Sequence, residues 1–374
     1  MAYFEQGSAS DINDLLGKLR VALAANGYSL VSNTGSGTSG GMRCHMSKGN
    51  LHVNFRTGFA NEVPVAVAGE RTTRWGTWVW PFSYHNGAWQ TQAINWLAFN
   101  LSTSHNLGAS WHNQPGAPGA SGGKGCASMI TCLSSISRYW LFILEDPDAV
   151  FLVAETDPNK VQHIAWGNLN TCQNLENPVE WYFGSRRMYK AHGDSLGEFC
   201  YSHSFPGYAN DNAMFRLNDS RWTYADGLSG WGASLINSGI PNAYGSGNYW
   251  ANLGLPVPDS EIYYPENYGF DNVTLRGYIE SQGRSILHPI HCFKLAEGGG
   301  AHLIGTIPHV GRTSMKPYII GDQVAGVGET YLAFPNHQRI SPFSVANNVV
   351  ENISSAHVDE VGNFFGTGIA IRRP

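Results

Sequence analysis

Two serines lie in the sequence pattern that surrounds the catalytic serine of many hydrolases. Ser39 lies in residues 37–41 (GTSGG) and Ser121 in residues 119–123 (GASGG), and both segments match G-x-S-x-G. A nucleophile elbow needs a strand before the serine and a helix after it. Neither serine is followed by a helical pattern, and a chain with 44 glycines produces such matches by chance. We therefore predict no catalytic residues, and a hydrolase that uses Ser39 or Ser121 is the least favoured alternative.

A glycine pattern for nucleotide binding is also present, at Gly35, Gly37 and Gly40. These residues match G-x-G-x-x-G and follow a predicted strand. The dinucleotide fingerprint also requires a helix directly after the glycines, within a βαβ unit. No such helix is indicated, so the segment is interpreted as a loop and no cofactor is expected.

Metal-ligand residue types form two clusters. His288, His291 and Cys292 lie in an apolar segment, where strand geometry would place the two histidines on opposite faces. Residues 145–148 (EDPD) bring three carboxylates together, which suggests calcium, but they lack the D-x-D-x-D-G pattern of a calcium loop. Turn formation explains these residues more simply, so we predict no metal site.

Six cysteines are spread along the chain: Cys44, Cys126, Cys132, Cys172, Cys200 and Cys292. No C-x-x-C pair is present, which argues against a structural zinc site. Cys126 and Cys132 are close enough in sequence to form a disulfide in an oxidising setting. We expect buried thiols that act as small hydrophobic residues.

One aromatic cluster suggests a ligand. It consists of Trp75, Trp78, Trp80, Tyr84 and Trp89. Exposed aromatic rings can stack on sugar rings, so a glycan-binding platform is conceivable. Packing in the core or at a subunit interface is the favoured alternative.

Composition restricts the class of protein. Only 14% of the 374 residues are charged, the net charge is −5, and no basic run exceeds Arg186-Arg187 or Arg372-Arg373, which argues against nucleic-acid binding. No apolar run reaches 18 residues, so no membrane span is predicted. The N-terminal segment lacks the basic and apolar regions of a signal peptide, so synthesis in a cytoplasm is expected. The 12 Trp, 17 Tyr and 17 Phe favour extensive permanent interfaces.

The clearest strands lie in residues 138–169. Tyr139–Leu144, Ala149–Ala154 and Val161–Trp166 are rich in β-branched and aromatic residues and are separated by two Asp-Pro turns. This pattern predicts a β-meander on a half-buried surface. Further strands are expected at residues 28–31, 51–55, 63–67, 272–279, 287–295, 303–308 and 331–334, while residues 93–101 fit either a helix or a strand.

One amphipathic helix is predicted over Asp11–Asn26. Ser10 is the expected N-cap, Ile12 and four leucines recur at helical spacing, and Gly27 follows where a left-handed residue ends a helix. We therefore predict a mainly β fold with few helices (α+β), with a β-meander or sandwich-like core and this N-terminal helix. Its regions would be 1–115 (helix plus strands), 116–125 (Pro/Gly-rich loop or linker) and 126–374 (β-rich), which can form one continuous unit.

The order of several short motifs resembles a family of tailed-bacteriophage virion proteins encoded among tail genes. These motifs are the helix after GSAS (7–10), QPG (114–116), YWLF (139–142), AWG (165–167), WYFGS (181–185), AMFRL (213–217) with Trp222, LRG (275–277), LHPI (287–290) and GETYLAFPN (328–336). Residues 200–262 depart from the pattern.

The resemblance implies a structural component of a phage tail, at the baseplate or tail tip, that is not an enzyme. Such a protein would form homo-oligomers, bind other tail proteins, and reside in the virion after assembly in the host cytoplasm. The main alternative is a receptor- or glycan-binding module of the virion, which would contact a host cell-surface receptor.

Overall fold

The structure is a computed structural model of the whole chain. It describes residues 2–34, 41–58, 79–80, 82–85, 88–91, 95–109, 111, 114–117, 126–132, 135–157, 160–172, 178–184, 187–190, 198–201, 213–216, 222–225, 287–295, 301–314, 318–325, 328–335 and 367–374. These residues are mostly strand, all paired antiparallel, and contain one helix. The predicted mainly β fold with few helices is therefore confirmed.

A seven-stranded central sheet contains the meander. Its strand order is β1 (Tyr3–Ala9), β10 (Ile136–Leu144), β11 (Ala149–Asp157), β12 (Lys160–Asn168), β14 (Glu180–Gly184), β17 (Ala213–Arg216) and β18 (Trp222–Ala225). The predicted meander is confirmed, because β10, β11 and β12 are consecutive neighbours in the sheet.

A second sheet, the helix-side sheet, lies against one face of the central sheet together with the helix. Its order is β2 (Ser29–Thr34), β3 (Arg43–Lys48), β4 (Leu51–Gly58), β8 (Asn95–Ser102), β9 (Cys126–Cys132), β15 (Arg187–Lys190), β16 (Glu198–Tyr201) and β5 (Val79–Trp80). A separate hairpin pairs β6 (Phe82–His85) with β7 (Ala88–Thr91). Residues 95–102 are a strand, which decides the alternative that the sequence left open.

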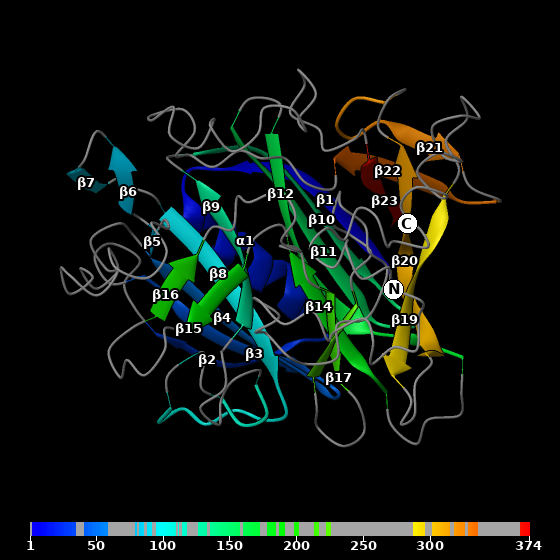
Figure 1. Cartoon of the computed structure of the whole chain (residues 1–374), viewed down its shortest axis with the longest axis horizontal. Helices are drawn as coiled ribbons and strands as arrows, with labels where there is room; N and C mark the ends of the chain where they lie inside the picture. Colours follow the sequence, from blue (N-terminus) through cyan, green and yellow to red (C-terminus); the bar gives the residue numbers. More distant parts are fainter. Residues whose placement is uncertain are drawn as a thin grey trace, which may run out of the picture.

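A third sheet, the C-terminal sheet, covers the other face of the central sheet. Its order is β13 (Asn170–Thr171), β20 (Ala301–Ser314), β23 (Thr367–Arg373), β22 (Thr330–Pro335) and β21 (Gln323–Ala325), and β19 (His288–Leu295) also pairs with β20. Figure 1 shows β10–β12 between α1 with β4 and β8 on one side and β19–β23 on the other. The strands predicted at 287–295, 303–308 and 331–334 are confirmed, whereas those at 63–67 and 272–279 lie outside the described residues.

The central sheet is buried on both faces. On β10, Tyr139, Leu141 and Ile143 face the helix and the helix-side sheet, whereas Trp140 and Phe142 face the C-terminal sheet. The prediction of a half-buried meander was therefore wrong. A strand covered on both faces has no solvent side to supply polar residues, which explains its nearly continuous apolar sequence.

The helix α1 (Ile12–Ala25) begins after an aspartate cap. The carboxylate of Asp11 accepts hydrogen bonds from the backbone N–H groups of Asn13 and Asp14, both at 2.8 Å. Ser10, the predicted N-cap, instead donates its backbone N–H to the Asp14 carboxylate at 2.9 Å. The N-cap prediction was thus wrong by one residue.

The apolar stripe and the end of the helix match the prediction. Ile12, Leu15, Leu16, Leu19 and Leu23 are buried in the core between the helix-side and central sheets. Gly27 follows the helix with φ +89°, a conformation that residues with a Cβ rarely adopt.

Candidate functional site

The aromatic cluster lies largely outside the described residues. Trp75 and Trp78 are not described, and only the backbone positions of Trp80, Tyr84 and Trp89 are, in β5, β6 and β7. Tyr84 is directly opposite Trp89 in the β6–β7 pair. The glycan platform therefore stays a prediction.

The two G-x-S-x-G segments and the glycine fingerprint also lie outside the described residues. Ser39, Ser121, Gly35, Gly37 and Gly40 all belong to segments that the structure does not describe. The loop interpretation of these motifs stays a prediction.

The acidic turn between β10 and β11 is held by a lysine. Nζ of Lys48 lies 2.8 Å from a carboxylate oxygen of Asp148 and 3.4 Å from one of Glu145. Hydrogen bonds to Asp148 and the attraction of both carboxylates raise the pKa of Lys48 against the opposing effect of its burial. Residues 145–148 form a turn, as predicted, and Asp146 lies in the left-handed region with φ 59°.

The predicted histidine pair occupies β19. Only the backbone positions of His288 and His291 are described, so the structure does not test how their side chains point. In the described part of the chain, no group of three or more His, Cys, Asp or Glu side chains is arranged to hold a metal ion.

The cysteine prediction holds for three of the four cysteines whose side chains are described. Cys44, Cys132 and Cys292 are buried, and burial raises the pKa of the Cys44 and Cys132 thiols to about 12. The prediction was wrong for Cys172, which is exposed. This residue directly follows the short edge strand β13, where little of the described chain covers it.

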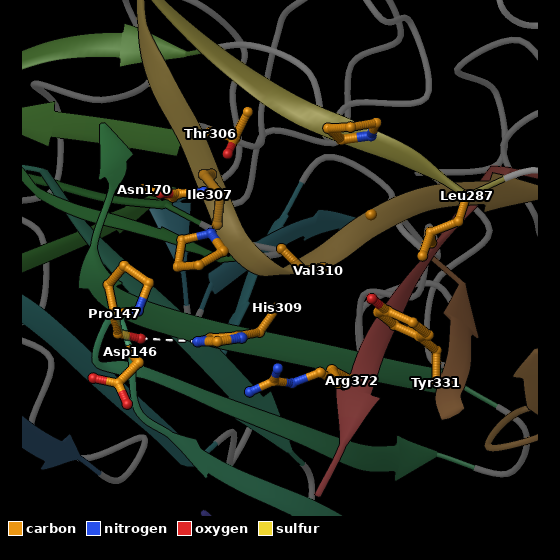
Figure 2. Close-up of a pocket in the computed structure, with 13 residues that line it drawn as sticks. Asp146, Pro147, Asn170, Leu287, Thr306, Ile307, His309, Val310, Tyr331 and Arg372 are labelled. Atoms are coloured by element: carbon orange, nitrogen blue, oxygen red, sulfur yellow. Dashed lines mark hydrogen bonds between the residues drawn. The ribbon is translucent and has the colours of Figure 1, made fainter. Parts of the chain in front are cut away.

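A polar cleft of about 360 Å³ opens where the meander turn meets the C-terminal sheet. It is lined by Asp146, Pro147, Asn170, Leu287, Pro289, Thr306, Ile307, Pro308, His309, Val310, Gly311, Tyr331 and Arg372. Figure 2 shows His309 between the Asp146-Pro147 turn and Arg372, with Tyr331 and Leu287 at the other end. The volume falls within the range of ordinary small-molecule sites.

A β-bulge positions His309 in the cleft. The pairing of β19 with β20 shifts between Pro289 and Ile290, which leaves residues 308–310 of β20 without direct partners on β19. His309 takes a left-handed backbone conformation there, with φ 63°. Its Nε2–H donates to the carbonyl oxygen of Pro147 at 2.9 Å, which ties the bulge to the meander turn.

The His309 ring ties the β20 bulge to the meander turn. Burial lowers its pKa below the ordinary value, and the nearby Arg372 lowers it further, although hydrogen bonds to the carbonyls of Pro147 and Glu145 oppose this. Its Nε2–H is committed to the Pro147 carbonyl oxygen.

Arg372 supplies the cationic group of the cleft. Its Nη1 donates to Glu329 Oε1 at 2.9 Å, and the Tyr331 hydroxyl donates to Glu329 Oε2 at 2.7 Å. These two bonds lower the pKa of Glu329, while burial and the bond to Glu329 raise the pKa of Tyr331 to about 12. Arg372 and Tyr331 are thus held in place around one carboxylate.

The cleft has the chemistry of a binding site for polar ligands. Arg372, the Asp146 carboxylate and the polar side chains of Asn170 and Thr306 can exchange hydrogen bonds with a hydroxyl-rich or anionic ligand. None of the cleft residues was selected from the sequence as a ligand-binding residue. In the sequence, only the acidic turn at residues 145–148 and the Arg372-Arg373 pair drew attention to charged residues of this cleft.

No protein-family model matches this chain, and no curated protein matches it in sequence. Across the described residues, no helix combines the length and apolar character needed to cross a membrane. The resemblance to tailed-phage virion proteins therefore stays a prediction.

Proposed function

We propose that this protein is a structural component of a phage tail, at the baseplate or tail tip. It acts by assembling with copies of itself and with other tail proteins, and it is not an enzyme. Assembly takes place in the host cytoplasm, and the protein then resides in the virion. The sequence motifs support the tail assignment, and the edge strand β2 supports the mode of action.

The β2 edge carries apolar residues and no charge. Its sequence, SLVSNT, is exposed along almost its whole length, and β3 is its only partner strand among the described residues. Leu30 is 47% and Val31 41% exposed, and both rank among the few exposed large hydrophobics of the described chain. Monomeric proteins commonly protect such edges with lysine, proline or very short strands. The β2 edge has only the bulge at Val31, so we infer that it is covered by a second copy of the chain.

The oligomeric state of the purified full chain tests this interface. We expect wild-type protein to sediment as an oligomer at micromolar concentration, and Leu30→Asp/Val31→Asp to shift it toward monomer. Leu107→Asp is the control, because Leu107 is even more exposed, at 59%, but lies in the segment after β8. A monomeric wild type, or an equal effect of the control, would overturn assembly through β2.

The tail assignment has a separate test. An antibody to this chain, imaged on intact phage particles by electron microscopy, should label the distal end of the tail. Label elsewhere on the particle, or no label, would refute the assignment.

The cleft favours a second candidate, a receptor- or glycan-binding module of the same particle. Its cationic, acidic and amide groups converge in one concave surface, as in sites that bind polar ligands. Binding of host-envelope saccharides should then be lost in Arg372→Gln and retained in Arg138→Gln, whose guanidinium pairs with Glu155 elsewhere. Loss in Trp78→Ala alone would instead assign binding to the aromatic cluster.

A further inference from the structure

Three histidines meet on the outer face of the helix-side sheet. His45 lies on β3, His52 on β4, and His105 follows β8. The ring of His105 contacts both others edge-to-face, with centroids 5.2 Å from His45 and 5.0 Å from His52. Three segments of the chain thus bring three titratable rings into one cluster, which we call the histidine cluster.

A buried row of polar side chains fixes the His45 end of the cluster. His45, Asn54 and Asn100 are directly opposite one another on β3, β4 and β8. The Asn54 amide group donates to Asn100 and Ser102, both at 3.0 Å, so its oxygen accepts from His45 Nδ1–H at 2.8 Å. An amide oxygen can only accept a hydrogen bond, so Nδ1 of His45 must carry the proton.

The other two rings have buried nitrogens that lack a partner. His52 Nδ1 and His105 Nε2 are both inaccessible and make no hydrogen bond. His105 is held instead by a hydrogen bond to the backbone of Val53. A buried nitrogen without a partner is tolerable as a lone pair but costly when protonated, because the charge would have neither water nor an acceptor.

The surroundings are also unfavourable for positive charge. The positive charge of Arg43 lowers the pKa of His45, and that of Arg216 lowers the pKa of His52. Arg56 lies on the same face of β4 as His52. The carboxylate of Glu180 is paired with Arg216 at 3.2 Å and accepts a hydrogen bond from Asn50. None of the hydrogen bonds that the described residues make to the three rings involves a carboxylate.

The cluster lies at the root of the segment after β8, of which residues 103–109, 111 and 114–117 are described and are together called residues 103–117. Gln114 closes this segment by accepting from the Asn106 N–H at 2.6 Å and donating to the Asn106 carbonyl at 3.0 Å. Arg216 donates to the Gly116 carbonyl at 2.9 Å. Trp111 within the segment is completely buried. His105 and Arg216 are therefore two of the groups that hold this segment on the sheet.

We propose that the histidine cluster is an acid-sensitive latch, which holds residues 103–117 on the helix-side sheet while its rings are neutral and releases them on protonation. Protonation places like charges on rings 5.0–5.2 Å apart and beside Arg216. Release exposes Trp111, Gln114 and the polar row of β3, β4 and β8.

The direction of the pH effect follows from the folded structure. Burial is the largest cause that lowers the pKa of all three histidines. For His105, burial and the charges of His45 and His52 together lower the pKa to about 4. In the unfolded or released state, the histidine rings titrate near the ordinary value of 6.5. That state therefore binds more protons than the folded state between pH 6.5 and 4. The stabilisation is complete above pH 6.5 and is lost as the pH falls toward 4.

Hydrogen exchange at pH 7.0 and pH 4.5 tests the latch in the full chain. After correction for intrinsic exchange rates, protection of peptides covering 103–117 should fall by at least about tenfold at pH 4.5, since one pKa unit corresponds to a tenfold change. Peptides from β10–β12 serve as the internal control and should stay protected. Unchanged protection of 103–117 in wild type would overturn the proposal.

Variants separate the latch from general acid sensitivity. His52→Gln/His105→Gln removes two of the titrating rings and should abolish the pH-dependent loss, whereas His309→Gln, which alters a half-buried histidine in the cleft, should retain it. An equal loss in both variants would refute the role of the cluster. If the double variant fails to fold, an NMR titration of wild-type histidine rings decides instead: ordinary titration of all three near pH 6.5 would also refute the latch.

Discussion

Replacing Gly167 with alanine is expected to destabilise the central sheet strongly. Gly167 lies on β12 directly opposite Ala149 on β11, where the meander turn approaches the strand. A Cβ at this position would lie 2.3 Å from the backbone oxygen of Asp148 and 2.8 Å from Cα of Ala149. The same Asp148 oxygen accepts the backbone N–H of Asn168 at 2.8 Å.

The magnitude follows from these contacts. Both obstructing atoms are backbone, so neither can move aside by a change of rotamer, and the strands must separate by roughly 1 Å to reach ordinary carbon contact distances. Overpacking of this kind costs about 1–3 kcal/mol. Loss of the Asn168–Asp148 bond adds about 1 kcal/mol. We therefore expect Gly167→Ala to lower the free energy of unfolding by about 3 kcal/mol.

Gly17→Ala is the matched control for the same chemical change. Gly17 lies inside α1, and a Cβ there would have no atom within 4 Å. Alanine in a helix interior is favoured over glycine by about 0.5–1 kcal/mol, so this variant should gain stability.

Urea unfolding followed by tryptophan fluorescence and circular dichroism measures both effects. The urea concentration at the midpoint should fall for Gly167→Ala and rise for Gly17→Ala. The slope of the free energy of unfolding against urea concentration should stay the same. If Gly167→Ala proves as stable as wild type, the close approach of the meander turn to β12 is wrong.

Three further substitutions probe other parts of the structure by the same unfolding assay. Arg216→Gln should cost about 3 kcal/mol, because it leaves the buried Glu180 without its cation, and the double variant with Glu180→Gln should recover part of the loss. Asp11→Ala should cost about 1 kcal/mol through loss of the N-cap, and Ser10→Ala should cost clearly less. Tyr28→Phe should cost about 1–2 kcal/mol, because the Trp166 indole N–H donates to its hydroxyl at 3.2 Å; no loss would show that this bond is absent.

Local chemistry explains which parts of the fold were predictable. The meander was recognised because Asp-Pro turns interrupt apolar runs of strand length, and α1 because five apolar residues recur on one face. The cap was misplaced because serine and aspartate are about equally good N-caps, and only the backbone decides between Ser10 and Asp11. The burial of both faces of β10 was missed because covering sheets come from distant segments.

The candidate sites depend on such distant contacts even more. The cleft joins Asp146 to His309 and Arg372, and Asp146 and Arg372 are separated by more than half of the chain. The histidine cluster needs the register of β3 with β4 and the return of the chain after β8 to bring His105 over the sheet. No spacing in the sequence encodes either arrangement, because each depends on how strands from different regions pair.

The position of the resemblance motifs determines what they can say about function. The YWLF motif forms β10 and the AWG motif ends β12, and Trp140, Phe142 and Trp166 are all buried in the two cores. Motifs of this kind report how the central sheet packs and not which partners the protein binds. Contacts with other molecules must come from the periphery, where this chain presents the uncharged β2 edge, the cleft around Arg372 and the segment over the histidine cluster. Substitutions at these three places should therefore change binding without unfolding the sheet, whereas substitutions in the motifs should change stability first.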